Sequence, residues 1–201
     1  MEILRFLYIG LCFFISILSF SRCLSKRDYV WLITAMLFTL ISDYSLLISN
    51  NETLGVATFC LVHVSYLLRF HNQPHLKEKL ILLSTIFLAS LIFGELKLSF
   101  VFLYAALLFL SLSSAYRVYK LKTYPPFNRK LIFCGMILFF LCDFCVFLYQ
   151  LQNYLQNFHF NIEIVSSFAV LFIWVFYTPA QLLLSISGYR YNTIKDGSES
   201  L

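Results

Sequence analysis

The sequence predicts an all-α fold, a polytopic helical bundle that crosses a lipid bilayer about seven times, and three observations predict it. The chain of 201 residues is 60% hydrophobic and 12% charged, whereas an average soluble domain is about 45–50% apolar and about 25% charged. Its apolar runs repeatedly reach the about 20 residues that a membrane-spanning helix needs. Its basic residues lie almost entirely in alternate loops between these runs. The alternative is a soluble helical protein, but such a protein does not need apolar runs long enough to span a membrane, so the repeated long runs argue against it.

Seven apolar segments are expected to be transmembrane helices, and the short connections between them should make neighbours in sequence antiparallel neighbours in space. The segments cover residues 3–20, 29–49, 53–70, 79–95, 98–116, 130–151 and 163–187. The first resembles the apolar part of a signal peptide, but Ser21-Arg22-Cys23 is not a small-x-small cleavage site, so we expect a retained helix. No linker or low-complexity tract interrupts the chain, and residues 1–201 are expected to form a single domain.

The distribution of basic residues predicts an N-terminus outside and a C-terminus in the cytoplasm. Thirteen of the 15 Lys and Arg residues lie in the first, third and fifth loops and in the C-terminal tail. Only Arg5 and Lys97 lie on the opposite side. Because cytoplasmic loops are enriched in Lys and Arg, the basic side is the inner one, and Tyr116, Tyr119 and Tyr124 fit an aromatic belt at that interface. We therefore expect a multi-pass protein of the cell membrane.

Charge and cysteine content exclude two other kinds of protein. The net charge of +5 does not indicate a nucleic-acid partner, because the positive residues act as loop anchors. The six cysteines lie mostly inside apolar runs, where thiols behave as small hydrophobic groups rather than as a disulfide framework. Cys142 and Cys145 have CxxC spacing, which we interpret as coincidence inside an apolar helix. The expected partners are membrane lipids, with no metal and no cofactor, and the oligomeric state is left open.

Three ionisable side chains lie inside the predicted spans, namely Asp43, His63 and Asp143. At 1.5 Å per residue, their depths from the outer surface are about 9, 15 and 12 Å. An ionisable group at the centre of a membrane helix costs about 2.5–3.5 kcal/mol on insertion scales, so such groups are seldom kept without a use. Their similar depth on three helices predicts one shared polar site. The other eight acids, including Asp28, and cations such as Arg69 are expected in loops or at chain ends.

A pair of carboxyl groups in a low-dielectric pocket is suited to acid catalysis. Two such groups cannot easily both be ionised, which leaves a proton donor beside a proton acceptor. We expect the carboxyl groups of Asp43 and Asp143 to lie within about 10 Å of each other, the range of a carboxyl pair that holds a water. Two alternatives stay open: each Asp only hydrogen-bonds a neighbouring helix, or the pair belongs to a proton-coupled transporter.

Polar residues at helical spacing accompany the two acids. Tyr66 follows His63 by three residues and Gln181 follows Tyr177 by four, so the members of each pair share a helix face. His63 can act as an acid, a base or a metal ligand, or it can make only a structural hydrogen bond. Pro179 frees a backbone carbonyl, which is tolerated where a membrane helix lines a cavity.

These motifs, in this order, resemble the YhhN-like lysoplasmalogenases. That family has a helix of the form small-L-F-S-L-L-G-D-x-x-L-L, and residues 35–47 read AMLFTLISDYSLL. A G-L-x-x-F-x-x-x-H-x-x-Y helix follows in the family, and residues 55–66 read GVATFCLVHVSY. Its later G-A-x-L-F-x-x-S-D is similar to GMILFFLCD at 135–143, and its closing Y-x-x-x-Q is similar to YTPAQ at 177–181. The resemblance extends over about residues 30 to 187.

The chain departs from the family pattern at several positions. Ser42 replaces the glycine before the first Asp, and Cys142 replaces the serine before the second. The family usually has eight helices, with a Lys-Pro pair at the start of the second, and Arg5-Phe6 occupies roughly that place here. If the first family helix is absent, an odd number of spans with an outside N-terminus remains.

The resemblance implies hydrolysis of the vinyl ether bond of lysoplasmalogen-type lysophospholipids to a fatty aldehyde and a glycerophospho-alcohol. The residues expected to be catalytic are Asp43, Asp143 and His63, and those expected to bind substrate are Tyr66, Tyr177 and Gln181. A transporter and a non-catalytic structural or sensing protein are the alternatives. The segments LFTLISDYSLLI and LFFLCDFCVFLY around the two acids are faintly alike, which keeps open a transporter with an internal repeat.

Overall fold

The computed structural model describes residues 2–70, 76–93, 96–155 and 163–191, and their regular structure is helical. The helices are α1 Glu2–Leu18, α2 Lys26–Asp43, α3 Glu52–Arg69, α4 Leu76–Phe93, α5 Leu96–Leu121, α6 Pro126–Leu155 and α7 Glu163–Ile186. A 3-10 turn, η1 (Ser19–Arg22), extends α1, and a π-helical turn, η2 (Tyr44–Ile48), extends α2.

These helices confirm the predicted fold class, and each of the seven predicted segments corresponds to one of them. Four stretches of the described residues are long and apolar enough to cross a membrane on their own: Glu2–Arg22, Lys26–Ile48, Leu96–Leu121 and Pro126–Gln150. α3 is more polar because it carries Glu52, His63 and Arg69. The chain is therefore a helical membrane protein.

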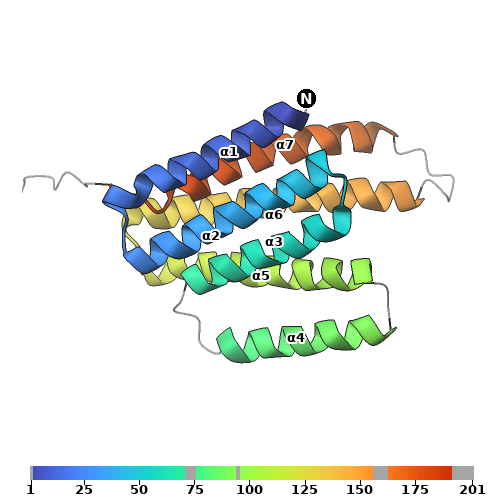
Figure 1. Cartoon of the computed structure of the whole chain (residues 1–201), viewed down its shortest axis with the longest axis horizontal. Coiled ribbons are helices and arrows are strands. Elements are labelled where there is room, and N and C mark those ends of the chain that lie inside the picture. The colour runs from blue at the N-terminus through green and yellow to red at the C-terminus, as the bar shows by residue number, and fades with distance from the viewer. Residues whose placement is uncertain (1, 71–75, 94–95, 156–162, 192–201) are drawn as a thin grey trace, which may run out of the picture.

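Six of the helices form a ring, and α4 lies outside it (Figure 1). Going round the ring, α1 packs on α2, α2 on α3, α3 on α5, α5 on α6 and α6 on α7, and α7 returns to α1. In Figure 1 the ring is flattened, with α1, α2 and α3 in front of α7, α6 and α5. α4 packs mainly on α5, and its side chains Ile81 and Leu82 are exposed, as expected of a surface that faces lipid.

Short polar residues begin and end the helices of the predicted α2–α3 hairpin. The Ser25 side chain accepts a hydrogen bond from the backbone N–H of Asp28 at the start of α2 (3.1 Å). Asn51 does the same for the N–H of Leu54 at the start of α3 (3.1 Å). Between the two helices Asn50 has φ of 52°, a left-handed conformation that asparagine tolerates better than most residues. A short polar turn thus joins α2 to α3.

The α2–α3 pair is tightly packed where α2 becomes the π-turn η2. A Cβ on Gly55 of α3 would lie 2.4 Å from the Leu46 side chain, so only glycine fits there without a shift. The Ser42 hydroxyl donates to the Gly55 carbonyl oxygen at 2.6 Å. Ser42 therefore has a partner on α3. A π-turn is rare and often marks a functional position, and η2 begins directly after Asp43.

A buried charged cluster at the end of the bundle where α2 begins and α3 ends corrects three predictions. Arg69 Nε and Nη2 donate to the two carboxyl oxygens of Asp28 at 2.9 and 3.1 Å, and its Nη1 donates to Ser187 Oγ at 2.9 Å. The Tyr124 hydroxyl donates to Asp28 Oδ1 at 2.7 Å. Asp28 and Arg69 are therefore not loop charges, and Tyr124 does not belong to an aromatic belt. The predictions were wrong because a charge at a helix end looks the same in sequence whether it faces water or a neighbouring helix. We call this end of the bundle the basic end, since it also carries Arg27 and Arg190.

Candidate functional site

Asp43 is the last residue of α2, and its carboxyl group lies inside the ring. The residue is only 4% exposed, and Tyr177 of α7 donates its hydroxyl to Asp43 Oδ2 at 2.6 Å. A distance this short is typical of a hydroxyl bonded to a carboxylate. Two residues predicted from the sequence, 134 positions apart, are thus in direct contact.

Asp143 has the same kind of partner on a different helix. Tyr104 of α5 donates its hydroxyl to Asp143 Oδ2 at 2.6 Å. This second pair differs from the first in exposure, because Asp143 and Tyr104 are half-buried whereas Asp43 and Tyr177 are buried. The site therefore holds two tyrosine–aspartate pairs, one enclosed and one partly open.

His63 of α3 lies between the two pairs. Its fully buried ring is centred 5.2 Å from the ring of Tyr104 and 5.3 Å from that of Phe139. Phe139 in turn meets the ring of Tyr177 edge-on, with 5.9 Å between centroids. A continuous path of contacts therefore runs from one carboxyl group to the other, through Asp43, Tyr177, Phe139, His63, Tyr104 and Asp143. The structure brings four of the six predicted site residues into this one path.

Cys142 precedes Asp143 on α6 and is buried in the hydrophobic core. The position where the family has serine is therefore next to one of the two carboxyl groups.

In three buried side chains, every polar atom lacks a hydrogen-bond partner among the described residues, and Asn128 Oδ1 and Arg129 Nε are single buried atoms that also lack one. The atoms of the three side chains are both ring nitrogens of His63, the hydroxyl of Tyr66, and both the oxygen and the nitrogen of the Gln181 amide. A buried polar group without a partner costs about 1–3 kcal/mol, so such groups are rare in folded proteins and each calls for an explanation. Tyr66 lies one turn beyond His63, and Gln181 one turn beyond Tyr177, both toward the basic end. Together these atoms are unsatisfied donors and acceptors inside the ring.

Sequence reasoning missed Tyr104 and Phe139. Each is an aromatic residue in an apolar segment, where such residues usually face lipid or fill the core. Tyr104 stands seven residues before Ser111, which gives two polar positions on one face of α5, but this signal is weak without a structure.

Arg5 adds a cation close to the enclosed pair. Its guanidinium lies 4.1 Å from the centre of the Trp174 ring, and Trp174 contacts Tyr177 with 5.7 Å between ring centroids. The residue at roughly the place of the family lysine is therefore two contacts from Tyr177 and three from Asp43. In the described part of the chain, no three His, Cys, Asp or Glu side chains gather where they could hold a metal ion.

A ring of membrane helices around two tyrosine-bonded carboxyl groups, a histidine and unpartnered polar atoms defines a polytopic membrane protein with a polar site inside the bundle. The sequence model of the YhhN family matches residues 4–188, and the chain belongs to this family. No curated protein and no solved structure matches the chain.

Proposed function

We propose that the protein is a membrane-embedded hydrolase that cleaves the vinyl ether bond of lysoplasmalogen-type lysophospholipids. The observation that supports this best is the path of contacts that joins the carboxyl groups of Asp43 and Asp143 through His63. Membership of the YhhN family points to the same activity. The substrate is then a lipid of the cell membrane in which the bundle is embedded.

The chemistry needs a proton donor and a proton acceptor. A neutral carboxyl group gives its proton to the alkene carbon of the C=C–O unit that is not bonded to oxygen. An oxocarbenium ion then forms at the other alkene carbon, which is bonded to oxygen. The other carboxyl group, ionised, stabilises this cation and takes a proton from the water that adds to it. The hemiacetal then breaks its C–O bond and gives a fatty aldehyde and the free hydroxyl of a glycerophospho-alcohol. The division of labour parallels that of the carboxyl pair in glycosidases.

The surrounding residues have separate parts in this scheme. Tyr177 and Tyr104 each bond one carboxyl oxygen, Oδ2, and so orient the other toward the reacting atoms. His63, Tyr66 and Gln181 hold the polar part of the lipid through their unpartnered atoms.

The decisive test is release of aldehyde from a 1-alkenyl lysophosphatidylethanolamine by the purified full-length chain. The matched control substrate is the 1-alkyl analogue, which has no double bond to protonate and should release none. Folded protein that releases no aldehyde would refute the hydrolase. Proton uptake into vesicles containing that same inactive protein would identify the transporter alternative.

A further inference from the structure

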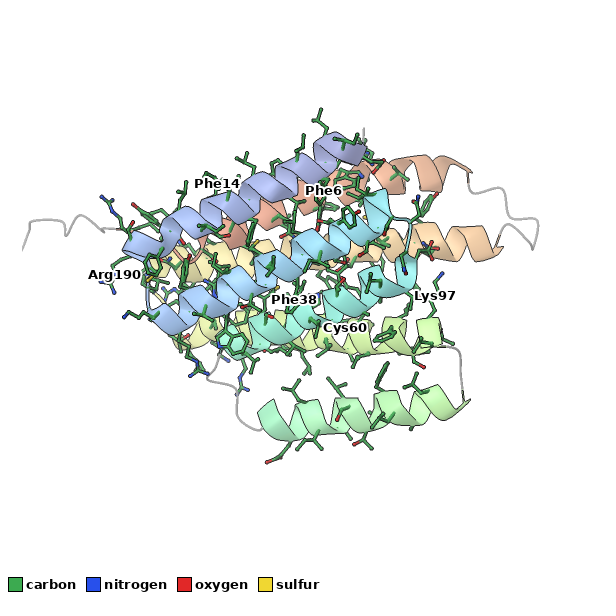
Figure 2. All side chains as sticks on the ribbon, in the orientation of Figure 1. Phe6, Phe14, Phe38, Cys60, Lys97 and Arg190 are labelled. Atoms are coloured by element: carbon green, nitrogen blue, oxygen red, sulfur yellow. The ribbon has the colours of Figure 1, made fainter. Side chains whose placement is uncertain are left out.

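A cavity of about 420 Å³ opens at the basic end of the bundle, away from the two aspartates. Its size falls within the about 300–1,000 Å³ that is typical of small-molecule sites. The polar and charged side chains that line it include Arg27, Arg69, Arg190, Asp28 and Tyr124. In Figure 2, Arg190 lies at the opposite end of the bundle from Lys97, which places the cavity at the end opposite the start of α5. Ser187, which accepts a hydrogen bond from the cavity-lining Arg69, follows the end of α7 and lies ten residues beyond Tyr177, or about 15 Å along the helix.

Arg69 lines the cavity and is held in place by hydrogen bonds that use only some of its N–H donors. The Arg69 side chain is fully buried, and the structure gives it three hydrogen bonds, two to Asp28 and one to Ser187. A guanidinium has five N–H donors. Two of these donors therefore make no hydrogen bond to a described residue, and the Arg69 charge acts on the cavity although its side chain has no surface open to solvent. Burial raises the pKa of the Tyr124 hydroxyl, so Tyr124 stays protonated and continues to hold Asp28 at neutral pH.

The rim of the cavity carries two more arginines. Arg190 is anchored at the mouth, since its backbone N–H donates to Arg22 O at 2.7 Å and its Nη2 donates to Leu24 O at 3.1 Å. Arg27 is exposed, and the structure gives its side chain no hydrogen bond to a described residue. Three arginines thus line the cavity against one carboxylate, which Arg69 already pairs with. The remaining positive charge favours an anion.

We propose that this cavity binds the phosphate group of an anionic ligand, with Arg69 at its base and Arg27 and Arg190 at its mouth. Guanidinium groups match phosphate oxygens in charge and in planar geometry. Apolar residues such as Phe70 and Val118 also line the cavity and suit the carbon part of a phosphate ester. Two sources share this chemistry, a phospholipid headgroup of the adjoining leaflet and a soluble phosphate ester.

Binding to the full-length chain in detergent tests the proposal. The probes are sn-glycerol 3-phosphate, followed by calorimetry, and phosphatidylglycerol against phosphatidylcholine, followed by native mass spectrometry. Arg27→Gln and Arg190→Gln should each weaken binding of the preferred probe by at least about tenfold, as expected for loss of a hydrogen bond to a charged group. Lys26→Gln is the matched control, because it removes the same charge one residue away, at a position that does not line the cavity.

The pattern of losses identifies the source of the phosphate. Selective loss of phosphatidylglycerol in the two arginine variants supports a lipid headgroup site, and selective loss of glycerol 3-phosphate supports a soluble ester. Equal weakening by Lys26→Gln would mean general surface attraction and would overturn the proposal, as would no binding of either probe. Arg27→Gln removes none of the hydrogen bonds described above, so the melting temperature of this variant should match that of the unmodified protein. A loss of binding in Arg27→Gln is then not caused by unfolding.

Discussion

The two aspartates differ in what surrounds them, although each accepts one tyrosine hydroxyl. Asp43 is enclosed by the ring and Asp143 is half-buried, so water and lipid reach them unequally. The unequal surroundings fit a pair whose members hold different protonation states during one reaction.

Replacement of either carboxyl group by an amide separates catalysis from structure. Asp43→Asn and Asp143→Asn keep the size of the side chain and an oxygen that accepts from tyrosine, but they remove the proton chemistry. Each should lower the rate of aldehyde release by about 10²–10⁴, the usual contribution of a general acid or base. Glu52→Gln is the control, because it makes the same change at the exposed end of α3, where Glu52 pairs with Lys97.

The pH profile of the unmodified protein gives the second readout. If one carboxyl group must be protonated and the other ionised, the rate rises and then falls with increasing pH, and its two limbs belong to the pair as a unit. A few-fold loss in both variants with an unchanged profile would mean that the aspartates only join helices.

Removal of the unpartnered Tyr66 hydroxyl should affect stability and substrate binding differently, because it leaves the fold intact but weakens binding. Tyr66→Phe removes a buried group without a hydrogen bond, so the melting temperature should stay equal or rise. If the hydroxyl bonds substrate, KM should rise by about two- to tenfold, the effect of one hydrogen bond. Tyr116→Phe, on an exposed tyrosine of α5, should change neither quantity. A fall in melting temperature with unchanged KM would assign Tyr66 to the core alone.

At the scale of elements, α6 and α7 pack closely because of a glycine in the third family-like motif. A Cβ on Gly135 would lie 2.8 Å from Leu184 Cγ and 3.4 Å from the Ala180 carbonyl oxygen. Leu184 is fully buried and has little room to move. The position of α7, which carries Tyr177 and Gln181, therefore depends on this contact.

Two glycine-to-alanine changes with opposite expected effects test that contact. Gly135→Ala should lower the melting temperature, because overpacking costs about 1–3 kcal/mol and exceeds the gain of up to about 1 kcal/mol in helix propensity. Gly10→Ala should raise it or leave it unchanged, since a Cβ there meets nothing within 4 Å. Thermal unfolding of both variants in one detergent measures the difference. Equal shifts would show that α6 and α7 separate without strain.

The sequence predicted the elements well because helix existence depends on local signals. Spanning length and hydrophobicity define the helices, whereas the capping roles of Ser25 and Asn51, which start α2 and α3 slightly earlier than predicted, became clear only in the structure. It did not predict that α4 lies outside the ring, since α4 is as apolar as its neighbours and packing order is not a local property. The pairing of Arg69 with Asp28 was missed for a related reason, because it depends on how two helix ends meet.

The candidate site was predictable to the extent that its residues are ionisable and lie at membrane depth. Asp43, His63 and Asp143 stand out because charge is costly there, and Tyr177 and Gln181 through their helical spacing. Tyr104 and Phe139 complete the path, but a tyrosine or phenylalanine in an apolar helix carries no such cost and gives no signal. The expected separation of the two carboxyl groups, about 10 Å or less, stays a prediction.

At the scale of the whole molecule, the basic residues gather at one end of the bundle. Arg190 marks this end in Figure 2, and Lys97 marks the other, where it pairs with Glu52. By the positive-inside rule we expect the basic end to face the cytoplasm. The cavity with its three arginines would then open to the inner leaflet, and the start of α1 would lie outside.

Reporter fusions test this orientation. A reporter joined after Leu201 should be active in the cytoplasm, and one joined before Met1 should be active outside, because an odd number of spans separates the two ends. The reverse result would contradict the orientation, and two ends on one side would contradict the seven spans.

The contact between α1 and α7 that closes the ring has a consequence for how the protein is made. The chain is synthesised from its N-terminus, so α2 with Asp43 is made before Tyr177, its hydrogen-bond donor on α7. Until the last helix docks, the acid has neither that partner nor the shelter of a closed ring. The site is therefore complete only after α7 has been inserted and has docked. A nascent chain that stops before α7 presents an unpartnered acid inside the membrane, the kind of feature by which unfinished membrane proteins can be distinguished from finished ones.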